Sequence, residues 1–336
     1  MKLTIALDAT DGAARTGSIA TARGVLPTPL FMPVGTRASV KALDAADLEA
    51  LGIPLILANT YHLMLRPGSP LIADLGGLHR FMDWPGHVLT DSGGFQIFSL
   101  EPKVTDDGAT FRSTYDGTRE HLTPERAAQI QSELGADIQM VLDVCPPLPS
   151  TDRVVRAAVE RTAAWARRGR GAFEAGASWR LDRGLDQAQF GIAQGGTDLA
   201  MRAESAQRTV EVGFDGYAIG GLSVGEPRHE MLPALAAALE HLPADQPRYL
   251  MGVGDPASIV EAVALGVDLF DCVLPTRHAR HGTVLTSEGR LMIKNLAYER
   301  DEGPLDATCG CSVCARYTRA YLRHLHRLGE PTAARL

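Results

Sequence analysis

The chain has 336 residues, 45% of them hydrophobic, with a formal net charge of -7. It can bury a large core, as one barrel or as two smaller domains, and its negative charge argues against indiscriminate nucleic-acid binding. No apolar run approaches the length of a membrane span, and acidic residues follow the N-terminal Met too early for a signal peptide. We therefore expect a soluble cytoplasmic protein with no membrane partner.

Eight short apolar runs recur along the chain, and each ends in a small or polar residue. Near-continuous apolar runs are typical of strands that are covered on both faces, so eight of them predict a (β/α)8 TIM barrel of the α/β class. A two-domain doubly wound fold is the competing architecture, but Gly252-Val253-Gly254 lacks the third glycine of a dinucleotide-binding loop. The runs are Leu30 to Gly35, Leu55 to Asn59, His87 to Asp91, Ile138 to Asp143, Phe190 to Gln194, Tyr217 to Gly221, Arg248 to Gly252 and Asp268 to Asp271.

Helical segments lie between many of these runs. Thr123 followed by Pro124 is an N-cap signal, and Gly135 is a C-cap signal for the same helix. Further helices are expected at 153–172, 198–212, 228–241 and 256–265.

Two segments do not fit a minimal barrel. Residues 103–122 carry two Asp-Gly turns between short alternating stretches, which predicts antiparallel hairpins inserted after the third barrel strand. Residues 282–296 predict a second hairpin that turns at Ser287 to Gly289. The segment 174–187 is expected to be a flexible connection.

Three carboxylates stand where barrel strands end, namely Asp91, Asp143 and Asp271. The carboxyl ends of barrel strands build the active site, so the three side chains should share one mouth. Crowded like charges raise at least one pKa, which suits an acid or a base. The alternative is that individual aspartates cap loops. Nearby glycines would bring bare backbone close to a ligand, and Phe95 and Met251 are candidates to sandwich a flat ring.

Asp271 is followed within ten residues by Arg277 and Arg280. This order pairs a candidate nucleophile with guanidinium groups that suit a phosphodiester. The alternative is a turn cap followed by ordinary surface charge. Residues 309–314 contain three of the five cysteines, which fits metal ligands in a reducing compartment better than a disulfide framework.

Taken together, the chain closely resembles the bacterial queuine tRNA-ribosyltransferases, or tRNA-guanine transglycosylases, over nearly its whole length. Membership in that family implies a barrel enzyme that exchanges the wobble guanine of certain tRNAs for a 7-deazaguanine base, a precursor of queuosine. The matching stretches are Phe31 to Thr36, Asn59 to Leu63, Thr90 to Gln96, Gly216 to Leu222, Tyr249 to Gly254 and the segment around Asp271.

The resemblance implies that Asp271 is the nucleophile and Asp91 the general acid/base, as in a retaining glycosidase whose second acceptor is a base. Asp143 would accept hydrogen bonds from the ring N–H and the amine of the base, while Gln194 and Gly221 read its carbonyl edge. The implied substrate-binding residues are Ser92, Gly93, Gly94, Phe95, Asp143, Gln194, Gly220, Gly221 and Met251. The implied RNA-binding residues are Gly252, Val253, Gly254, Asp255, Pro256, Ala257, Ser258, Thr276, Arg277, His278, Ala279 and Arg280.

Three positions bear on the incoming base. Cys145 and Val224 match the bacterial pattern of the family, which favours the smaller 7-aminomethyl-7-deazaguanine. Val144 departs from the pattern, because a Glu usually lies between the aspartate and the cysteine. This departure affects how the pocket controls its hydrogen bonding to different bases. His62 is expected to be a structural histidine.

Cys309, Cys311 and Cys314 match three of the four structural zinc ligands of the family. The fourth, a histidine, aligns just past Leu336. Either His324 or His326 substitutes for it or the chain is truncated, and the notable Arg and Leu content around both histidines favours truncation. We expect a catalytic barrel at residues 1–280 and a zinc-binding subdomain at 281–336. The resemblance also implies a homodimer.

Two other functions compete with this one. A non-catalytic tRNA-binding paralogue of the same fold would be expected to lose the nucleophile or the base-reading aspartate, yet both Asp271 and Asp143 are present. A barrel enzyme that acts on a small phosphorylated metabolite would also account for the arginines at 277 and 280. The match over several long motifs favours the transglycosylase.

Overall fold

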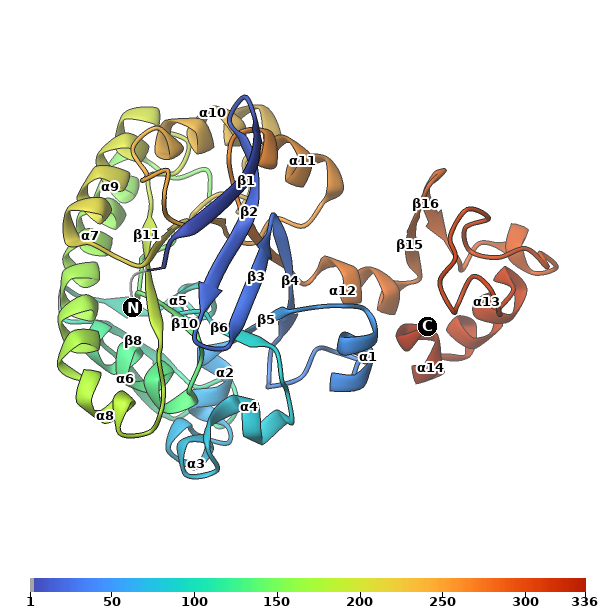
Figure 1. Ribbon diagram of the computed structural model, residues 1–336, viewed down its shortest axis with the longest axis horizontal. Coiled ribbons are helices and arrows are strands. Elements are labelled where there is room, and N and C mark those ends of the chain that lie inside the picture. Colours follow the sequence, from blue (N-terminus) through green and yellow to red (C-terminus); the bar gives the residue numbers. More distant parts are fainter. Residues whose placement is uncertain (1–2) are drawn as a thin grey trace.

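A closed barrel of eight parallel strands forms the centre of the computed structural model, which describes residues 3–336 (Figure 1). Each of the eight predicted apolar runs overlaps one strand, so the barrel is confirmed and the doubly wound alternative is wrong. Leu269 of the last strand pairs with Leu30 of the first, which closes the ring. The strands are β4 (Leu30–Gly35), β5 (Leu55–Ala58), β6 (His87–Thr90), β10 (Ile138–Met140), β11 (Ala188–Ala193), β12 (Gly216–Ile219), β13 (Arg248–Leu250) and β14 (Leu269–Cys272).

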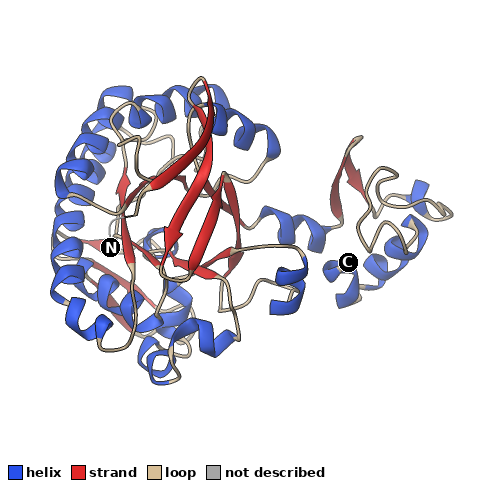
Figure 2. Cartoon of the chain, in the orientation of Figure 1, coloured by secondary structure: helices blue, strands red, loops and turns tan. Residues whose placement is uncertain are grey.

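Burial on both faces explains why these strands are continuously apolar. Every residue of β5, β6, β11 and β12 is buried, because inward side chains fill the barrel and outward ones pack beneath helices (Figure 2). The predicted caps of the first long helix are confirmed: Thr123 accepts from the Arg126 N–H, and Gly135 has a φ of 72°. The long helices are α6 (Pro124–Leu134), α7 (Asp152–Ala175), α9 (Leu199–Val212), α10 (Arg228–Leu239) and α11 (Pro256–Ala264).

Both predicted hairpin regions are antiparallel. Residues 103–122 form a three-stranded sheet, and residues 283–292 form a two-stranded one. The second hairpin turns at 287–288, one residue shorter than expected, because Gly289 already belongs to the returning strand. The strands are β7 (Lys103–Val104), β8 (Ala109–Arg112), β9 (Arg119–Leu122), β15 (Thr283–Thr286) and β16 (Gly289–Met292).

The prediction of a flexible connection at 174–187 is wrong. Helix α7 continues to Ala175, and a short helix, α8 (Ala177–Leu181), follows it. Arg180 of α8 is buried, lies 3.7 Å above the ring centroid of Phe173 and donates to the Phe173 carbonyl at 2.7 Å. A cation–π contact and a hydrogen bond therefore hold a segment whose composition resembles a linker.

An N-terminal antiparallel sheet of β1 (Ile5–Asp11), β2 (Ala14–Thr21) and β3 (Gly24–Thr28) was not predicted. Ile5, Ile19 and Leu26 of this sheet join the barrel core. Arg15 of β2 is buried and makes a two-pronged ion pair with Asp268, at 2.8 and 2.6 Å. Because Asp268 precedes β14, this sheet lies at the amino end of the barrel, and the carboxyl end stays available for a site.

The remaining helices fall into two groups. Short helices follow the first three barrel strands: α1 (Ala45–Ala50), α2 (Thr60–Leu65), α3 (Ser69–Asp74), α4 (Gly77–Met82) and α5 (Gly94–Phe98). Beyond the barrel, α12 (Leu274–His281) leads into a C-terminal lobe (Figure 1). The lobe contains β15, β16, η1 (Leu296–Tyr298), α13 (Arg319–Leu328) and α14 (Pro331–Arg335).

The C-terminal lobe has a small hydrophobic cluster of its own, made of Leu291, Ile293, Leu305 and Leu322. This separate core is consistent with the division expected near residue 280. Within residues 3–336, none of the helices combines the length and the apolar character that crossing a membrane requires.

Candidate active site

Asp91 follows β6 at the carboxyl end of the barrel and is 8% exposed. Its carboxylate accepts the Asn59 side-chain amide at 2.5 Å and the Thr60 backbone N–H at 2.7 Å, both from the segment after β5. Burial raises the pKa of Asp91 to about 6, although these hydrogen bonds oppose the shift. Asp91 can therefore change protonation state near neutral pH.

Asp143 follows β10 and is 5% exposed. Gln194, directly after β11, donates its side-chain amide to Asp143 Oδ2 at 2.6 Å, and the Ser92 hydroxyl lies 3.4 Å from Oδ1. Burial and, to a smaller extent, the charge of Asp91 raise the pKa of Asp143 to about 6, although the hydrogen bonds from Gln194 and Ser92 oppose the shift. The Gln194 carbonyl oxygen is buried and has no hydrogen-bond partner within residues 3–336. An unpaired buried acceptor beside a carboxylate is a natural contact for a ligand.

Asp271 lies within β14, three strands from β6 and Asp91 around the barrel. Its Oδ1 accepts the Tyr249 hydroxyl at 2.6 Å and the Gly252 N–H at 2.7 Å. Burial raises the pKa of Asp271, and the same two hydrogen bonds oppose the shift. Among residues 3–336, Oδ2 of Asp271 accepts no hydrogen bond, so one oxygen is held and the other is open.

The three aspartates share one electrostatic environment. Burial raises the pKa of the Tyr249 phenol well above 10, and the charges of Asp271 and Asp91 both add to that shift. The charge of Asp91 in turn raises the pKa of Asp143. No Lys, Arg or His within the described chain forms an ion pair with any of the three. Two buried carboxylates and a half-buried one, none with a paired cation, are costly to stability, which is typical of a functional site.

Glycines form the walls between these side chains. A Cβ on Gly94 would lie 3.1 Å from an Asp143 oxygen, and a Cβ on Gly221 would meet the Gln194 oxygen at 2.1 Å. Gly221 also has a φ of +63°, a conformation that L side chains rarely adopt. Gly93, with a φ of +81°, lies against Tyr61. Side chains at Gly94 and Gly221 would crowd Asp143 and Gln194.

The two candidate stacking residues differ in exposure. Phe95, on α5, is 61% exposed, whereas Met251, just after β13, is half-buried against the barrel core. The proposed sandwich of a flat ring stays a prediction.

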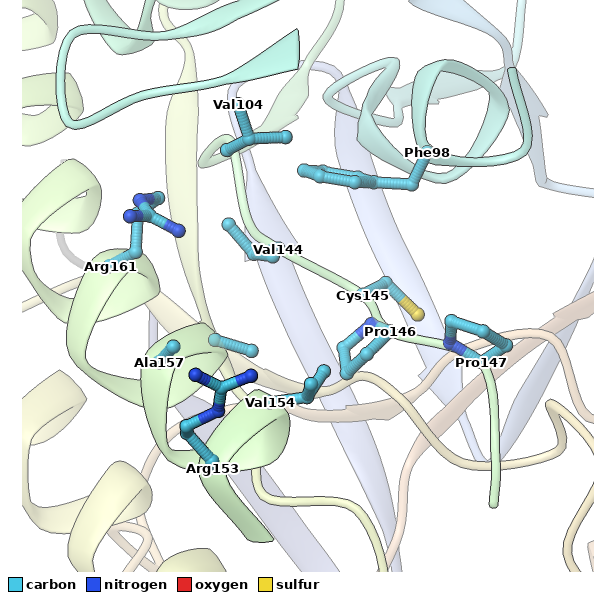
Figure 3. A pocket seen from close by; sticks show the side chains of 11 residues that line it. Phe98, Val104, Val144, Cys145, Pro146, Pro147, Arg153, Val154, Ala157 and Arg161 are labelled. Carbon is cyan, nitrogen blue, oxygen red and sulfur yellow. The ribbon is translucent and has the colours of Figure 1, made fainter. Parts of the chain in front are cut away.

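An apolar cavity of about 410 Å³ opens beside the loop after β10 (Figure 3). Val144 and Cys145 face it together with Phe98, Val104 and residues of α7, and Arg153 and Arg161 lie at its side. Asp91, Asp143 and Asp271 are not among its lining residues. Burial raises the pKa of the Cys145 thiol to about 12, so it remains neutral.

The predicted RNA-contacting residues flank Asp271. Gly252 to Ser258 run from the end of β13 into α11, where Asp255 caps the helix by accepting the Ser258 N–H at 2.9 Å. Thr276 to Arg280 lie in α12, which has Pro275 in its first turn and Gly282 as its C-cap. One terminal nitrogen of Arg280, Nη1, is buried without a partner in residues 3–336.

The three cysteines of the C-terminal lobe lie together. The sulfur atoms of Cys309, Cys311 and Cys314 are all within 4.8 Å of one another, so this group can hold a metal ion. Neither His324 nor His326 belongs to the metal-binding group found among residues 3–336. His326 instead lies with its Nε2 3.3 Å from the Ala279 carbonyl of α12. The structure thus supplies three thiol ligands and no fourth.

Several residues that shape the site were not predicted from the sequence. Asn59 and Thr60 bind Asp91, and Tyr249 binds Asp271. Asn59 and Tyr249 belong to the matched family motifs, which were the available signal. Arg202, on α9, is fully buried behind the glycine loops and carried no signal beyond a helical pattern. His62, expected to be structural, contacts the Tyr115 hydroxyl at 2.9 Å.

Comparison with known proteins identifies the family. The model of the family described as queuine tRNA-ribosyltransferase matches residues 10–336. A queuine tRNA-ribosyltransferase of Halothermothrix orenii is 53% identical over 325 residues, which cover 96% of this chain and 85% of the relative. Those of Herpetosiphon aurantiacus and Sphingopyxis alaskensis are each 51% identical, over 99% and 100% of this chain and 83% and 89% of the relatives. The chain therefore belongs to the queuine tRNA-ribosyltransferase family.

Proposed function

We propose that the protein is a tRNA-guanine transglycosylase that exchanges the wobble guanine of tRNA for 7-aminomethyl-7-deazaguanine through a covalent ribosyl-aspartyl intermediate. The observation that carries the proposal is a set of three carboxylates without paired cations at the carboxyl end of the barrel, with Asp91 and Asp143 buried and Asp271 half-buried. The name of the relatives, queuine tRNA-ribosyltransferase, supports the reaction class.

In the first step, Asp271 attacks C1′ of the target ribose. The Tyr249 hydroxyl and the Gly252 N–H bind Oδ1, which leaves Oδ2 oriented as the attacking atom. A bond forms between Oδ2 and C1′ while the bond from C1′ to guanine N9 breaks. The departing base takes a proton from Asp91, whose pKa of about 6 suits a group that both gives and accepts protons.

In the second step, the roles reverse. The incoming base loses its ring proton to the Asp91 carboxylate, and its nitrogen attacks C1′. The Asp271 carboxylate is released, and the Tyr249 and Gly252 donors stabilise its negative charge. Two displacements at C1′ retain the configuration of the sugar.

Asp143 and its neighbours read the base. A carboxylate at Asp143 accepts from the ring N–H and the exocyclic amine, while the Gln194 amide and the Gly221 N–H donate to the carbonyl. Gln194 donates to Asp143 in the free protein, so it exchanges this partner for the base. Adenine would leave buried polar groups unpaired and is rejected. Cys145 and Val224 favour the aminomethyl base, and Val144 places an apolar wall where a Glu is usual in the family.

Contacts to RNA would come from both sides of Asp271. Residues 252–258 and 276–280 offer backbone donors and the guanidinium groups of Arg277 and Arg280 for phosphates. The target nucleotide must leave the anticodon stack to reach the three carboxylates. A tRNA substrate also implies a cytoplasmic location.

The C-terminal lobe is proposed to be a zinc-binding subdomain, residues 281–336, next to a catalytic barrel, residues 1–280. Cys309, Cys311 and Cys314 would hold Zn²⁺, whose role here is to stabilise the lobe, with a fourth ligand from outside the described group. The homodimer implied by the family is part of the same proposal.

The decisive experiment incubates the protein with radiolabelled guanine and unmodified tRNAs. Label should enter tRNAs with a guanine at the wobble position and no others, since the base site and the anticodon loop must both fit. Matched transcripts that carry adenine at that position are the control. Equal labelling of both transcripts, or of neither, would contradict the proposal. An Asp271→Ala variant should also lose the denaturation-resistant adduct with tRNA.

A further inference from the structure

Arg202 is a buried cation that the mechanism above does not use. It lies on α9, is fully buried and forms no ion pair with a carboxylate in the described chain. Burial lowers the pKa of its guanidinium to about 10, which still leaves it charged at neutral pH. A buried charge without a counter-ion is kept only where its donors are well satisfied, so its contacts show what it stabilises.

The guanidinium donates to four backbone carbonyls from two loops. Nε and Nη1 reach the carbonyls of Gly196 at 2.7 Å and Ala193 at 3.1 Å, on either side of Gln194. Nη1 and Nη2 reach Gly220 at 2.6 Å and Gly221 at 2.8 Å. One planar fork thereby links the ends of β11 and β12, the two strands that carry the groups proposed to read the carbonyl of the base.

The contacts of Arg202 fix the orientation of one backbone donor, the Gly221 N–H. In a trans peptide the C=O of one residue and the N–H of the next point in opposite directions. Because Arg202 holds the Gly220 carbonyl from behind the loop, the Gly221 N–H is turned away from it, toward the pocket. The Gly221 N–H indeed acts on the Cys145 thiol, which lies on that side. A flipped peptide would present a carbonyl to the base instead and would break hydrogen bonds to a charged donor.

We infer that Arg202 is a positioning residue for base recognition, which holds the Gly220–Gly221 peptide so that the site donates to an oxo group of the base. The inference rests on the proposed function. It adds a reason why the site prefers a base that carries an oxo group. Arg202 itself does not touch the base. Its effect passes through the Gly221 N–H and the placement of Gln194.

The test compares Arg202→Lys and Arg202→Gln with wild type in two constants. The first is the KM for guanine in the exchange assay, and the second is the inhibition constant of 6-thioguanine, which keeps the ring N–H and amine but carries a weaker acceptor. Loss of one aligned donor should raise the guanine KM about tenfold and change the 6-thioguanine constant less than about threefold. Neither the KM nor the inhibition constant depends on the amount of active protein, so the ratio of the two constants compares folded molecules only. Arg208→Lys, an exposed arginine on the same helix paired with Glu204, is the matched control and should change neither constant.

Each other outcome overturns the inference. Variants in which both constants stay at wild-type values, or weaken by the same factor, would show a purely structural role. If neither variant folds, hydrogen exchange of residues 217–223 in wild type decides. A held loop exchanges slowly with and without guanine, whereas a loop that slows at several amides only when guanine binds is not held by Arg202. A wild-type protein that exchanges no guanine would instead defeat the proposed function.

Discussion

Two aspartates three residues apart, Asp268 just before β14 and Asp271 within it, have opposite surroundings. Asp268 precedes β14 at the amino end of the barrel and is paired with Arg15 through two hydrogen bonds. Asp271 lies toward the carboxyl end, where a phenol and a backbone N–H bind it and no cation pairs with it in residues 3–336. Asp268 is fully buried and Asp271 is half-buried, so the degree of burial does not by itself mark a candidate nucleophile. The absence of a paired cation, together with one open oxygen, distinguishes Asp271.

Replacement of Asp271 should produce the largest effect. Asp271→Asn removes the proposed nucleophile but keeps its shape, so guanine exchange should fall by at least about 10⁴-fold, with the fold intact. Exchange of labelled guanine under single-turnover conditions measures this. Activity within tenfold of wild type would show that Asp271 is not the nucleophile. Asp271 and Asp268 would then not differ in function.

Asp268→Asn should have the opposite profile. It leaves the Arg15 guanidinium buried without its counter-ion, which should lower the free energy of unfolding by about 3–5 kcal/mol. Urea unfolding followed by circular dichroism measures the loss. The kcat of the molecules that remain folded should stay near wild type, and a selective loss of kcat would mean that both ends of the barrel serve the chemistry.

Asp143→Asn tests the cost of a cation-free carboxylate. The folded pKa of Asp143, about 6, lies above the usual 3.8, so its contribution to stability is fully present below pH 4 and is lost as the pH rises through 6. The variant lacks this loss. It should be more stable than wild type by about 1–3 kcal/mol at pH 8, and the difference should shrink toward pH 4. Urea unfolding at three pH values measures it, and a constant difference would contradict the shifted pKa.

The pH profile of the reaction should show the smallest effect. Asp91 and Asp143 form a coupled pair with pKa values of about 6, and both must be ionised to accept protons or hydrogen bonds from the incoming base. The kcat/KM for guanine should therefore fall about tenfold per pH unit near pH 6, and more steeply, toward about a hundredfold per unit, once both carboxylates are protonated. Circular dichroism at each pH separates this from unfolding. A flat profile down to pH 4.5 would remove the acid/base role of Asp91.

The same contrast explains what the sequence could predict. Buried parallel strands appear in the sequence as continuous apolar runs, so all eight strands could be located. The three aspartates at their carboxyl ends could be located with them. The N-terminal sheet was missed because β1 is exposed at six of its seven residues and has no clear alternation. Its tie to the barrel, Arg15 to Asp268, joins residues 253 positions apart.

Partners of the site residues were harder to predict for a related reason. Tyr249, Asn59 and Arg202 act through contacts between different strands and helices, which local patterns do not encode. Arg202 lies in a helical segment that contains other charged residues, and only the fold shows that it points inward. The segment 174–187 was misjudged because the packing of Arg180 on Phe173 depends on two helices that local composition does not link.

The position of α12 gives the C-terminal lobe a mechanical connection to the reaction centre. The helix begins three residues after Asp271, and it is the covalent path from the barrel to the lobe. If the lobe melts, α12 loses its packing there, and the strand that holds Asp271 loses one support while it keeps its ladders to β4 and β13. Heat that unfolds the lobe would thus loosen the segment around Asp271 before the barrel itself opens.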